Sequence, residues 1–372
     1  MAPLVTAIRE PQRGGSQAFV SDLARGLTGR GHEVHVYAAS GSEIPGVEVI
    51  DTGVDPESLA GTLYRAFGPS GPAGSGPAGP RPAGPEPSAA ESAFARAYRG
   101  VQEIRYDVIH NHAFDAPAIR LAATLQAPVV HTLHLPPDKA VAAALRHAAR
   151  GGRPPAVAAV SVFQASAWRQ IIRVDAILPP YVPTHVIPWS REAGEGAIFA
   201  GRLSPEKGAA EAIDIARAAG VPIDVYGDAY DAGYSRDQIG PRRAWPGVTV
   251  HEAVPRASLW AAMAHAAVVL FPARWAEPFG MAAAEAQACG TPVVAFRCGA
   301  LGEVIADGVT GFLVPPDDIA AAAEAVGRTA RISRSDCRDH AEGHLDLEQS
   351  LDAHERLYRH VVSPVARAAD HG

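Results

Sequence analysis

Two carboxylates eight positions apart, Glu277 and Glu285, are the residues with the clearest chemical meaning in this sequence. Pro-Phe-Gly follows Glu277 directly, and the small residues after it predict a helix from Met281 to Cys289. Glu277 then lies just ahead of a helix N-terminus, where free backbone N–H groups and the helix dipole attract anions. Glu285 lies inside the helix, on the same face as Met281. A ligand with hydroxyl groups at both ends and phosphates between them, such as a nucleotide sugar, suits this arrangement.

The alternative is that both glutamates are ordinary surface residues. A Glu near a helix start is often only a partner of the dipole, and one inside a helix is usually solvated. Glu285, however, stands in a run of Ala and Cys that should face a core, where an unpaired carboxylate is costly. Trp275 before the pair and Gly-Thr-Pro-Val-Val after it strengthen the ligand-binding interpretation.

Two cations, Arg202 and Lys207, stand five positions apart in the segment Arg-Leu-Ser-Pro-Glu-Lys-Gly, after a predicted buried strand and before a predicted helix. The carboxyl end of a strand is where open α/β sheets bind ligands. Arg can hold a phosphate through two parallel hydrogen bonds, and Lys adds a point charge. Taken alone they could be ordinary exposed charges, but beside the glutamate pair they favour pyrophosphate binding.

Gly14 and Gly15 occupy the first predicted strand-to-helix turn, where glycines let the backbone approach a phosphate at a helix N-terminus. A plain turn is the alternative.

Four histidines fall at the ends of two predicted strands of the first half, with no recognised metal-ligand spacing. For at least two of them we expect only core or loop hydrogen bonding, and His134 would point into a cleft. They are His110, His112, His131 and His134.

The elements that must position these residues alternate between strands and helices, which predicts parallel sheets covered by helices on both faces. In the first half the predicted strands are 4–8, 33–38, 107–112 and 128–133, with one helix whose apolar face is Phe19, Val20, Leu23 and Leu27 and another helix at about 117–125. In the second half the predicted strands are 197–203, 222–227, 248–254, 267–271, 292–296 and 311–314, with helices at 208–219, 256–266, 281–289 and 317–327.

The 372 residues are enough for about two domains. We expect one domain over 1–185 and a nucleotide-sugar-binding domain over 190–345, joined by the Pro-rich segment 179–189. Residues 68–88 are almost wholly Gly, Pro, Ala and Ser, which predicts a disordered insertion. An amphipathic helix at about 347–362, within the last segment 346–372, is expected to pack back on the first domain.

Composition excludes several classes of protein. A net charge of −7 argues against a nucleic-acid surface, and no apolar run approaches the length of a membrane span. No signal peptide is recognisable, and three cysteines form no disulfide or metal framework. We therefore expect a cytoplasmic protein without nucleic-acid partners or an integral membrane segment. The sequence gives no indication of the oligomeric state.

The order of these motifs along the chain resembles that of the retaining GT-B glycosyltransferases of family 4. The motifs are the Gly-Gly turn, the strand-end histidine, the Arg202–Gly208 segment and the glutamate pair. The resemblance implies two Rossmann-like doubly wound domains that face each other across a cleft. It also implies roles for residues of this chain: Arg202 and Lys207 contact the pyrophosphate, Glu285 takes the ribose hydroxyls, and Gly15, in the Gly14–Gly15 turn, approaches a phosphate. Glu277 and the backbone of Phe279, Gly280, Met281 and Ala282 hold the donor sugar, His134 lies beside that sugar, and His112 matches a second histidine with a less defined role.

The expected function is therefore transfer of a hexose-like sugar from a UDP- or GDP-sugar to an acceptor, a soluble small molecule, with retention of configuration. His134, Glu277, Arg202 and Lys207 are the candidate catalytic residues. No Asp-x-Asp motif lies where a nucleotide would bind, consistent with the metal-independent transfer of this family, so no cofactor is expected. The alternatives are a GT-B epimerase or phosphorylase and a catalytically silent nucleotide-sugar-binding protein. The sequence departs from the family at Val186-Ile-Pro-Trp-Ser190, where Asn-Gly-Val-Asp usually follows Ile-Pro.

Overall fold

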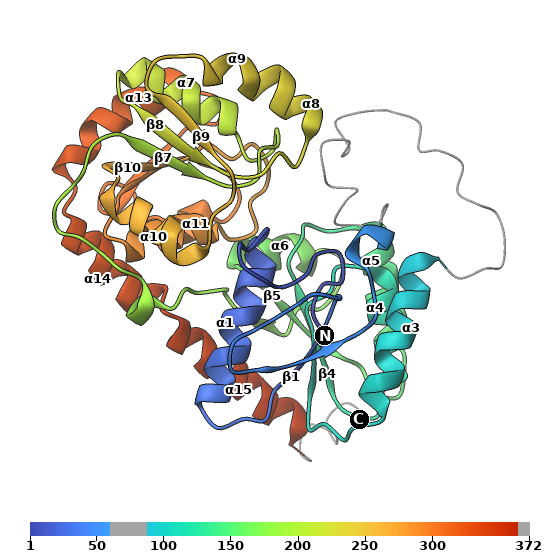
Figure 1. Ribbon diagram of the computed structural model, residues 1–372. Helices are drawn as coiled ribbons and strands as arrows, with labels where there is room; N and C mark the ends of the chain where they lie inside the picture. Colours follow the sequence, from blue (N-terminus) through green and yellow to red (C-terminus); the bar gives the residue numbers. More distant parts are fainter. Residues whose placement is uncertain (60–87, 364–372) are drawn as a thin grey trace. The chain divides into compact units, whose positions relative to one another are not determined.

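The computed structural model describes residues 1–59 and 88–363 and divides the chain into two compact units (Figure 1). Unit 1 comprises Met1–Arg9, Leu23–Pro179 and Leu351–Gly372, and unit 2 comprises Glu10–Asp22 and Pro180–Ser350. The insertion expected at 68–88 lies outside the described residues except for Ser88. The Ser88 hydroxyl accepts a hydrogen bond from the Glu91 N–H and caps helix α3.

Unit 1 is built from short parallel strands and the helices that connect them. Its strands are β1 (His35–Ala38), β2 (Glu48–Asp51), β3 (Ile109–Asn111), β4 (Val129–Leu133), β5 (Ala156–Ala159) and β6 (Ala176–Ile177). Its helices are η1 (Pro56–Leu59), α3 (Ala89–Gln102), α4 (Ala116–Ala122), α5 (Lys139–Ala148) and α6 (Val162–Arg169), with the second half of α1 (Gly15–Gly29).

The strand expected at 4–8 is wrong. Strands β1 and β2 pair in parallel, β3 to β6 form a second parallel sheet, and the backbone of Met1 and Ala2 lies between β1 and β3. The Ala2 N–H donates to the Tyr37 carbonyl, and the Met1 carbonyl accepts from the His112 N–H. The chain then turns at residues 4–6, so Leu4 and Ile8 are buried as irregular backbone. The apolar residues of this segment correctly indicate that it is buried, but the segment does not pair with a strand.

Unit 2 contains one six-stranded parallel sheet in the order β12-β11-β10-β7-β8-β9. Its strands are β7 (Ala197–Ala200), β8 (Ile223–Tyr226), β9 (Val248–His251), β10 (Val268–Phe271), β11 (Val293–Phe296) and β12 (Gly311–Val314). The strand order reverses between β7 and β10, as in a doubly wound nucleotide-binding sheet. Ligands of such sheets bind outside the carboxyl ends of the strands at this switch point, which locates the candidate site.

The helices of unit 2 cover both faces of the sheet (Figure 1). The longer ones are α7 (Ala209–Ala219), α10 (Arg256–His265), α11 (Met281–Ala288), α13 (Ile319–Arg328) and α14 (Arg334–His344). The shorter ones are η2 (Thr184–Val186), α8 (Ala232–Tyr234), η3 (Ser235–Ile239), α9 (Gly240–Arg243), α12 (Leu301–Val304) and η4 (Thr329–Arg331). Helices α7 and α13 lie on one face, and α10 and α11 lie on the other.

The departure from the family at Val186–Ser190 lies in a segment that two buried arginines of α14 fix within unit 2. Arg334 donates to the Ser190 carbonyl at 2.8 Å, and Arg338 donates to the Thr184 and Ile187 carbonyls at 2.9 and 3.0 Å. Charged donors to backbone carbonyls make strong hydrogen bonds, so this segment has a defined path without the usual family residues.

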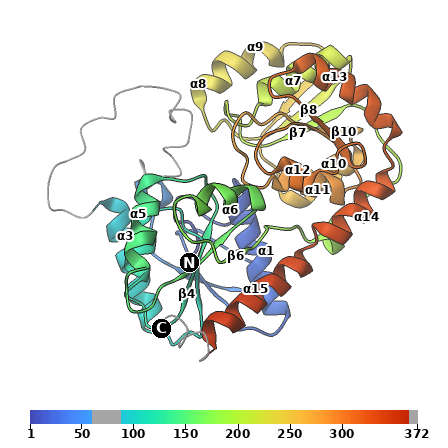
Figure 2. The same cartoon turned by 180° about the vertical axis from the view of Figure 1, so that it is seen from behind.

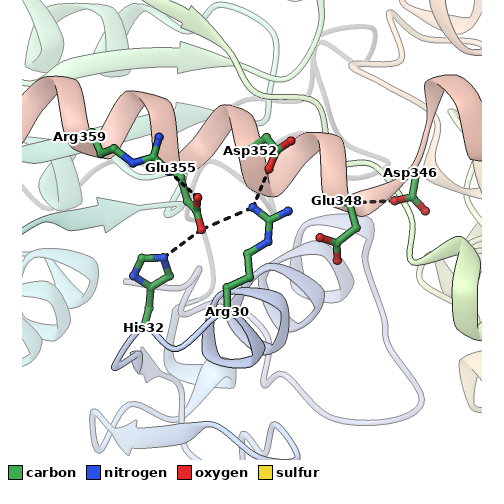
Figure 3. A network of polar contacts seen from close by, with 7 residues as sticks. All are labelled: Arg30, His32, Asp346, Glu348, Asp352, Glu355 and Arg359. Atoms are coloured by element: carbon green, nitrogen blue, oxygen red, sulfur yellow. Dashed lines mark hydrogen bonds and ion pairs between the residues drawn. The ribbon is translucent and has the colours of Figure 1, made fainter.

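Helix α15 (Leu347–Val362) begins in unit 2 and continues into unit 1, where it runs beside α1 (Figures 1 and 2). Its Leu357 packs with Val130, Ala158 and Leu178, on the strands β4 to β6 and the segment after them. Polar contacts add to this packing, because Arg30 pairs with Asp352 at 2.7 Å and His32 bonds Glu355 at 3.1 Å (Figure 3).

Candidate active site

The loops after β7 and β10 meet at the switch point of unit 2, because these two strands are hydrogen-bonded neighbours. The loop after β7 carries Arg202 and Lys207, and the loop after β10 carries Glu277. Two residues that lie 70 positions apart in sequence are thereby brought into contact: Lys207 Nζ donates to Glu277 Oε2 at 2.7 Å.

The Lys207–Glu277 pair is largely buried, with 20% and 9% of the two side chains exposed. The Trp275 indole N–H donates to the same Glu277 oxygen at 2.7 Å, and Lys207 Nζ lies 4.9 Å from the centre of the Trp275 ring. A cation above an aromatic face is attracted by the ring. Glu277 and Trp275 together hold the ammonium group in one place ahead of α11.

Two glycines allow the backbone to pack closely around the Lys207–Glu277 pair. Gly208 has a φ of +77°, and a Cβ at this position would lie 2.0 Å from the Pro272 carbonyl oxygen. Gly299 has a φ of +58°, and its Cβ would lie 2.2 Å from the Glu277 carbonyl oxygen. A larger residue at Gly208 would push the Lys207 and Glu277 loops apart, and one at Gly299 would push the loop after β11 away from the Glu277 loop.

Helix α11 begins at Met281 with Gly280 as its N-cap, and no side chain caps it. The Ala283 and Ala284 N–H groups bond back to the Gly280 carbonyl, which leaves the N–H groups of Met281 and Ala282 at the open end of the helix. Phe279 is buried, whereas Met281 and Ala282 are half-buried. The helix therefore offers the backbone donors expected of an anion site directly beside the Lys207–Glu277 pair.

Arg202 lies in the same loop as Lys207 but has different partners. Its Nη2 is 3.3 Å from Glu206 Oε1, and its guanidinium lies 4.5 Å from the centre of the Tyr230 ring. Ser204 also donates to Glu206 Oε1, at 2.7 Å. Each cation of the loop thus has one carboxylate beside it, Glu206 for Arg202 and Glu277 for Lys207.

Glu285 is buried one turn into α11, where the sequence predicts an unusual environment for a carboxylate. It accepts two hydrogen bonds from Arg256, the first residue of α10. Arg256 also binds Asp22 of α1. Gly15 begins α1, after Gly14, and a Cβ at Gly15 would lie 3.1 Å from Met281 Sδ. Unit 2 therefore groups Gly14, Gly15, Met281 and Glu285 around the N-terminal half of α11.

The histidines form a separate cluster within unit 1. His112 Nδ1 lies 3.0 Å from His134 Nε2, and the His110 ring stacks on His112 with centroids 4.0 Å apart. His110 also bonds Tyr358 of α15 at 2.7 Å, and His131 bonds Asn111 at 2.8 Å. His112 and His134 are therefore direct partners, while His110 and His131 take the structural hydrogen bonds expected of two of the four.

Burial determines the protonation of this cluster. It lowers the pKa of His134 to about 3, with a further contribution from His354, and lowers the pKa of His112 well below its ordinary value, with His110 adding to the effect. Both rings are therefore neutral at pH 7, and one nitrogen of the pair carries the hydrogen that the other accepts. By exposed surface, His112 is buried and His134 is half-buried.

No group of three or more His, Cys, Asp or Glu side chains suited to a metal ion occurs within residues 1–59 and 88–363.

Models of two families match consecutive parts of the chain. "Glycosyltransferase Family 4" matches residues 13–188, and "Glycosyl transferases group 1" matches residues 190–339. The chain belongs to these glycosyltransferases. The second match contains the whole switch-point site, including Arg202, Lys207, Glu277 and Glu285.

Curated relatives of this glycosyltransferase include a D-inositol 3-phosphate glycosyltransferase from Acidothermus cellulolyticus, 28% identical over 85% of this chain and 78% of the relative. A phosphatidyl-myo-inositol mannosyltransferase from Mycolicibacterium smegmatis is also 28% identical, over 82% of this chain and 78% of the relative.

Solved structures of the same fold include sucrose-phosphate synthase from Thermosynechococcus elongatus, with a TM-score of 0.72 and 18% identity, covering 96% of this chain and 98% of that chain. Another is Anabaena HepE in complex with UDP and glucose, with a TM-score of 0.69 and 21% identity, covering 94% and 97%. The fold is thus the GT-B fold with two Rossmann-like domains. In the part of the chain that the structure describes, no helix combines the length and apolarity needed to cross a membrane.

Sequence reasoning missed two residues that this glycosyltransferase places at the site. Arg256 and Asp22 lie 234 positions apart and meet only in the fold. A signal for Asp22 was present, because it stands three residues after Phe19 on the apolar face of α1, where a carboxylate needs a partner. Trp275 stands next to the glutamate pair in the sequence, but its hydrogen bond to Glu277 has no sequence signal.

Proposed function

We propose that this glycosyltransferase moves a hexose-like unit from a nucleoside diphosphate sugar, with UDP or GDP as the nucleotide, to a soluble small-molecule acceptor with retention of configuration. The observation that carries the proposal is the Lys207–Glu277 pair at the switch point, 2.7 Å apart and beside the uncapped start of α11. A cation and free backbone N–H groups suit a diphosphate, and a carboxylate suits sugar hydroxyls.

The donor would lie across the carboxyl ends of β7 and β10. Lys207 and Arg202 would contact the diphosphate, Glu277 and the backbone of Phe279 to Ala282 would hold the sugar, and Glu285 would accept the ribose hydroxyls. Gly15, after Gly14, would approach a phosphate. HepE, which shares the fold, is described in complex with UDP and glucose, which supports a UDP-sugar as the first donor to test.

Charge development explains why these residues would accelerate transfer. As the bond between sugar and phosphate breaks, negative charge grows on the leaving diphosphate. Lys207, Arg202 and the Met281 and Ala282 N–H groups would stabilise that charge, which is the largest single contribution in many enzymes. A neutral His134 would contact the sugar as a hydrogen-bonding partner and not as a cation. Attack of the acceptor on the face that the diphosphate leaves would give retention, with no metal required.

The acceptor is proposed from composition and from the relatives. A net charge of −7 favours a small soluble molecule over an anionic lipid surface. One relative is named for D-inositol 3-phosphate and another for phosphatidyl-myo-inositol, so free inositols and inositol phosphates belong in the first acceptor panel.

The test begins with a thermal-shift screen of the full chain against UDP, GDP, ADP and TDP sugars. The stabilising donor is then incubated with the acceptor panel, and products are followed by proton NMR. We expect release of the nucleoside diphosphate that depends on acceptor, with a product whose anomeric configuration matches the donor. An inverted product would contradict the proposed mechanism.

The alternative functions give different outcomes in the same experiment. An epimerase changes the donor sugar without an acceptor, and a phosphorylase needs phosphate as the nucleophile. A catalytically silent binding protein gives a thermal shift without any turnover, including the slow hydrolysis of the donor that transferases commonly show.

A further inference from the structure

Arg256 connects three helices of unit 2 through a buried guanidinium. It is the first residue of α10, and its Nη1 binds both oxygens of Asp22 on α1, at 3.0 and 2.9 Å. Its other edge faces α11, where Nε and Nη2 bind Glu285 at 3.1 and 2.8 Å. The exposed fractions of the three side chains are 10% for Arg256, 4% for Asp22 and 8% for Glu285.

The charges of this group are fixed by their mutual contacts. Desolvation acts to lower the pKa of Arg256, but Asp22 and Glu285 more than offset it, so the pKa lies above its ordinary value. Two carboxylates share one guanidinium, which leaves the group with one net negative charge. Removing Arg256 would leave two uncompensated carboxylates, whereas removing either carboxylate leaves a neutral pair, so Arg256 is the member on which the other two depend.

The hydrogen bonds to Glu285 are asymmetric. Both bonds from Arg256 end on Oε1, and no other side chain or backbone group among the described residues bonds the carboxylate. A guanidinium that meets one carboxylate usually binds both of its oxygens in parallel. Here the Nε–Nη2 edge, which has the two donors for such a pair, meets only Oε1 of Glu285, while Nη1 is held by Asp22.

We infer that Arg256 is a positioning residue for the donor nucleotide, which fixes Glu285 by Oε1 so that Oε2 is directed to the ribose hydroxyls, and that Asp22 keeps Arg256 in this orientation. The inference rests on the proposed function, in which Glu285 accepts the ribose hydroxyls. Without Asp22, the guanidinium is free to turn and to bind both oxygens of Glu285, which removes the acceptor that the ribose needs.

Discrimination between ribose and deoxyribose tests this role. The probes are UDP and 2′-deoxy-UDP, or the corresponding pair of whichever diphosphate binds best, titrated calorimetrically into the full chain. Loss of a hydrogen bond to a charged group weakens binding by about 10- to 100-fold, so the wild-type protein should prefer UDP over 2′-deoxy-UDP by that ratio. Glu285→Gln should reduce the ratio.

Two variants separate positioning from general stability. Arg256→Lys retains a cation but lacks the planar fork, so it should lower the ratio while keeping part of it. Asp22→Asn keeps the shape of the side chain and should lower the ratio, because Arg256 can then reorient. It provides the test if Arg256→Lys does not fold. Arg297→Ala removes an exposed arginine of unit 2 that pairs with Asp307, and should leave the ratio unchanged. A purely structural role would weaken UDP and 2′-deoxy-UDP equally.

The outcomes distinguish this inference from the proposed function. If no nucleoside diphosphate binds the wild-type chain, the proposed function fails. If UDP binds and the ratio is the same in wild type and Asp22→Asn, the inference is overturned while the diphosphate site stands. If the wild-type protein shows no preference for UDP over 2′-deoxy-UDP, the ribose role of Glu285 is wrong, and the inference falls with it.

Discussion

At the scale of single residues, Lys207 carries the clearest functional expectation. It is one of only two lysines in the sequence, and the other, Lys139, is exposed at the start of α5. Lys207 instead lies between Glu277 and Trp275, whose contacts hold its ammonium group beside the start of α11. A matched pair of lysine substitutions can therefore separate the site from the rest of the surface.

Lys207→Ala and Arg202→Ala should each weaken binding of a nucleoside diphosphate by about 10- to 100-fold, because each removes charge-assisted bonds worth roughly 1.5–3 kcal/mol. Lys139→Ala should bind as the wild type does. His134→Ala should keep the diphosphate affinity but lose much of kcat, because its proposed partner is the sugar. Calorimetry and initial rates measure the two effects. Equal loss of diphosphate affinity in His134→Ala and Lys207→Ala would refute the assigned roles.

The buried histidines make stability depend on pH. Burial lowers the pKa of His131 to about 3, whereas an unfolded His titrates near 6.5. Below pH 6.5 the unfolded chain binds a proton that the folded chain does not, so stability is lost as pH falls, by about 1.4 kcal/mol per pH unit for each such histidine. His112 should act in the same direction.

Urea unfolding at pH 7.5, 6.0 and 5.0 measures this dependence. His131→Gln should flatten the fall in stability, while substitution of the exposed His185 by Gln should not change it. An equally steep fall in His131→Gln would show that His131 is not the source.

Residue types and spacing in the sequence indicate candidate site residues, but they do not indicate the partners of those residues. The candidate residues belong to local motifs, so their types and spacing can be recognised from the sequence alone. They are Arg202, Lys207, Glu277 and Glu285. The Lys207–Glu277 contact follows only once β7 and β10 are known to be neighbours, and no spacing rule supplies that order. The Arg256 contacts to Asp22 and Glu285 depend on the packing of three helices, which has no local signature.

At the scale of elements, the spacing of apolar residues and the positions of Gly and Pro predicted most of the strands and helices. The predicted strand at 311–314 and the predicted helix at 347–362 have the bounds of β12 and α15. The predicted strand at 4–8 was wrong because apolar composition indicates burial alone: Met1 and Ala2 bond to β1 and to His112 after β3, and the chain turns at residues 4–6. Short strands such as β6, with two residues, carry too little pattern to be seen.

The contact between α1 and α15 gives a prediction for one glycine. A Cβ at Gly26 would lie 2.7 Å from Cδ1 of the fully buried Leu351, whereas a Cβ at Gly29 meets nothing within 4 Å. Gly26→Ala should be less stable than Gly29→Ala by about 1–3 kcal/mol, because overpacking against Leu351 opposes the gain in helix propensity that both substitutions share. Gly29→Ala serves as the control, because its new methyl group meets no neighbour.

Urea unfolding measures both variants, and a double variant sharpens the test. Leu351→Ala alone leaves a cavity and should cost about 2–5 kcal/mol. In Gly26→Ala with Leu351→Ala the new methyl occupies part of that cavity, so the combined loss should be smaller than the sum. If Gly26→Ala is as stable as Gly29→Ala, the packing of α15 against α1 is looser than described.

At the scale of the whole molecule, we propose that the positive charge needed for catalysis comes from side chains and a helix start. Activity on the best donor and acceptor should therefore be unchanged after EDTA treatment. Initial rates with EDTA, and with added Mg²⁺ or Mn²⁺, provide the measurement. A strict requirement for either metal would contradict this part of the proposal.

Chemical footprinting of the two lysines tests the central claim most directly, because it locates the donor on the working enzyme. The full chain is acetylated under limiting reagent with and without a saturating donor, in samples that also consume the donor when acceptor is added, and each lysine is quantified by mass spectrometry. We predict that the donor slows modification of Lys207 by about tenfold or more, as expected for a site occupied at ten times its Kd or above, and leaves Lys139 unchanged. Equal modification of Lys207 with and without donor, in samples that turn the donor over, would contradict a donor site at the switch point of unit 2.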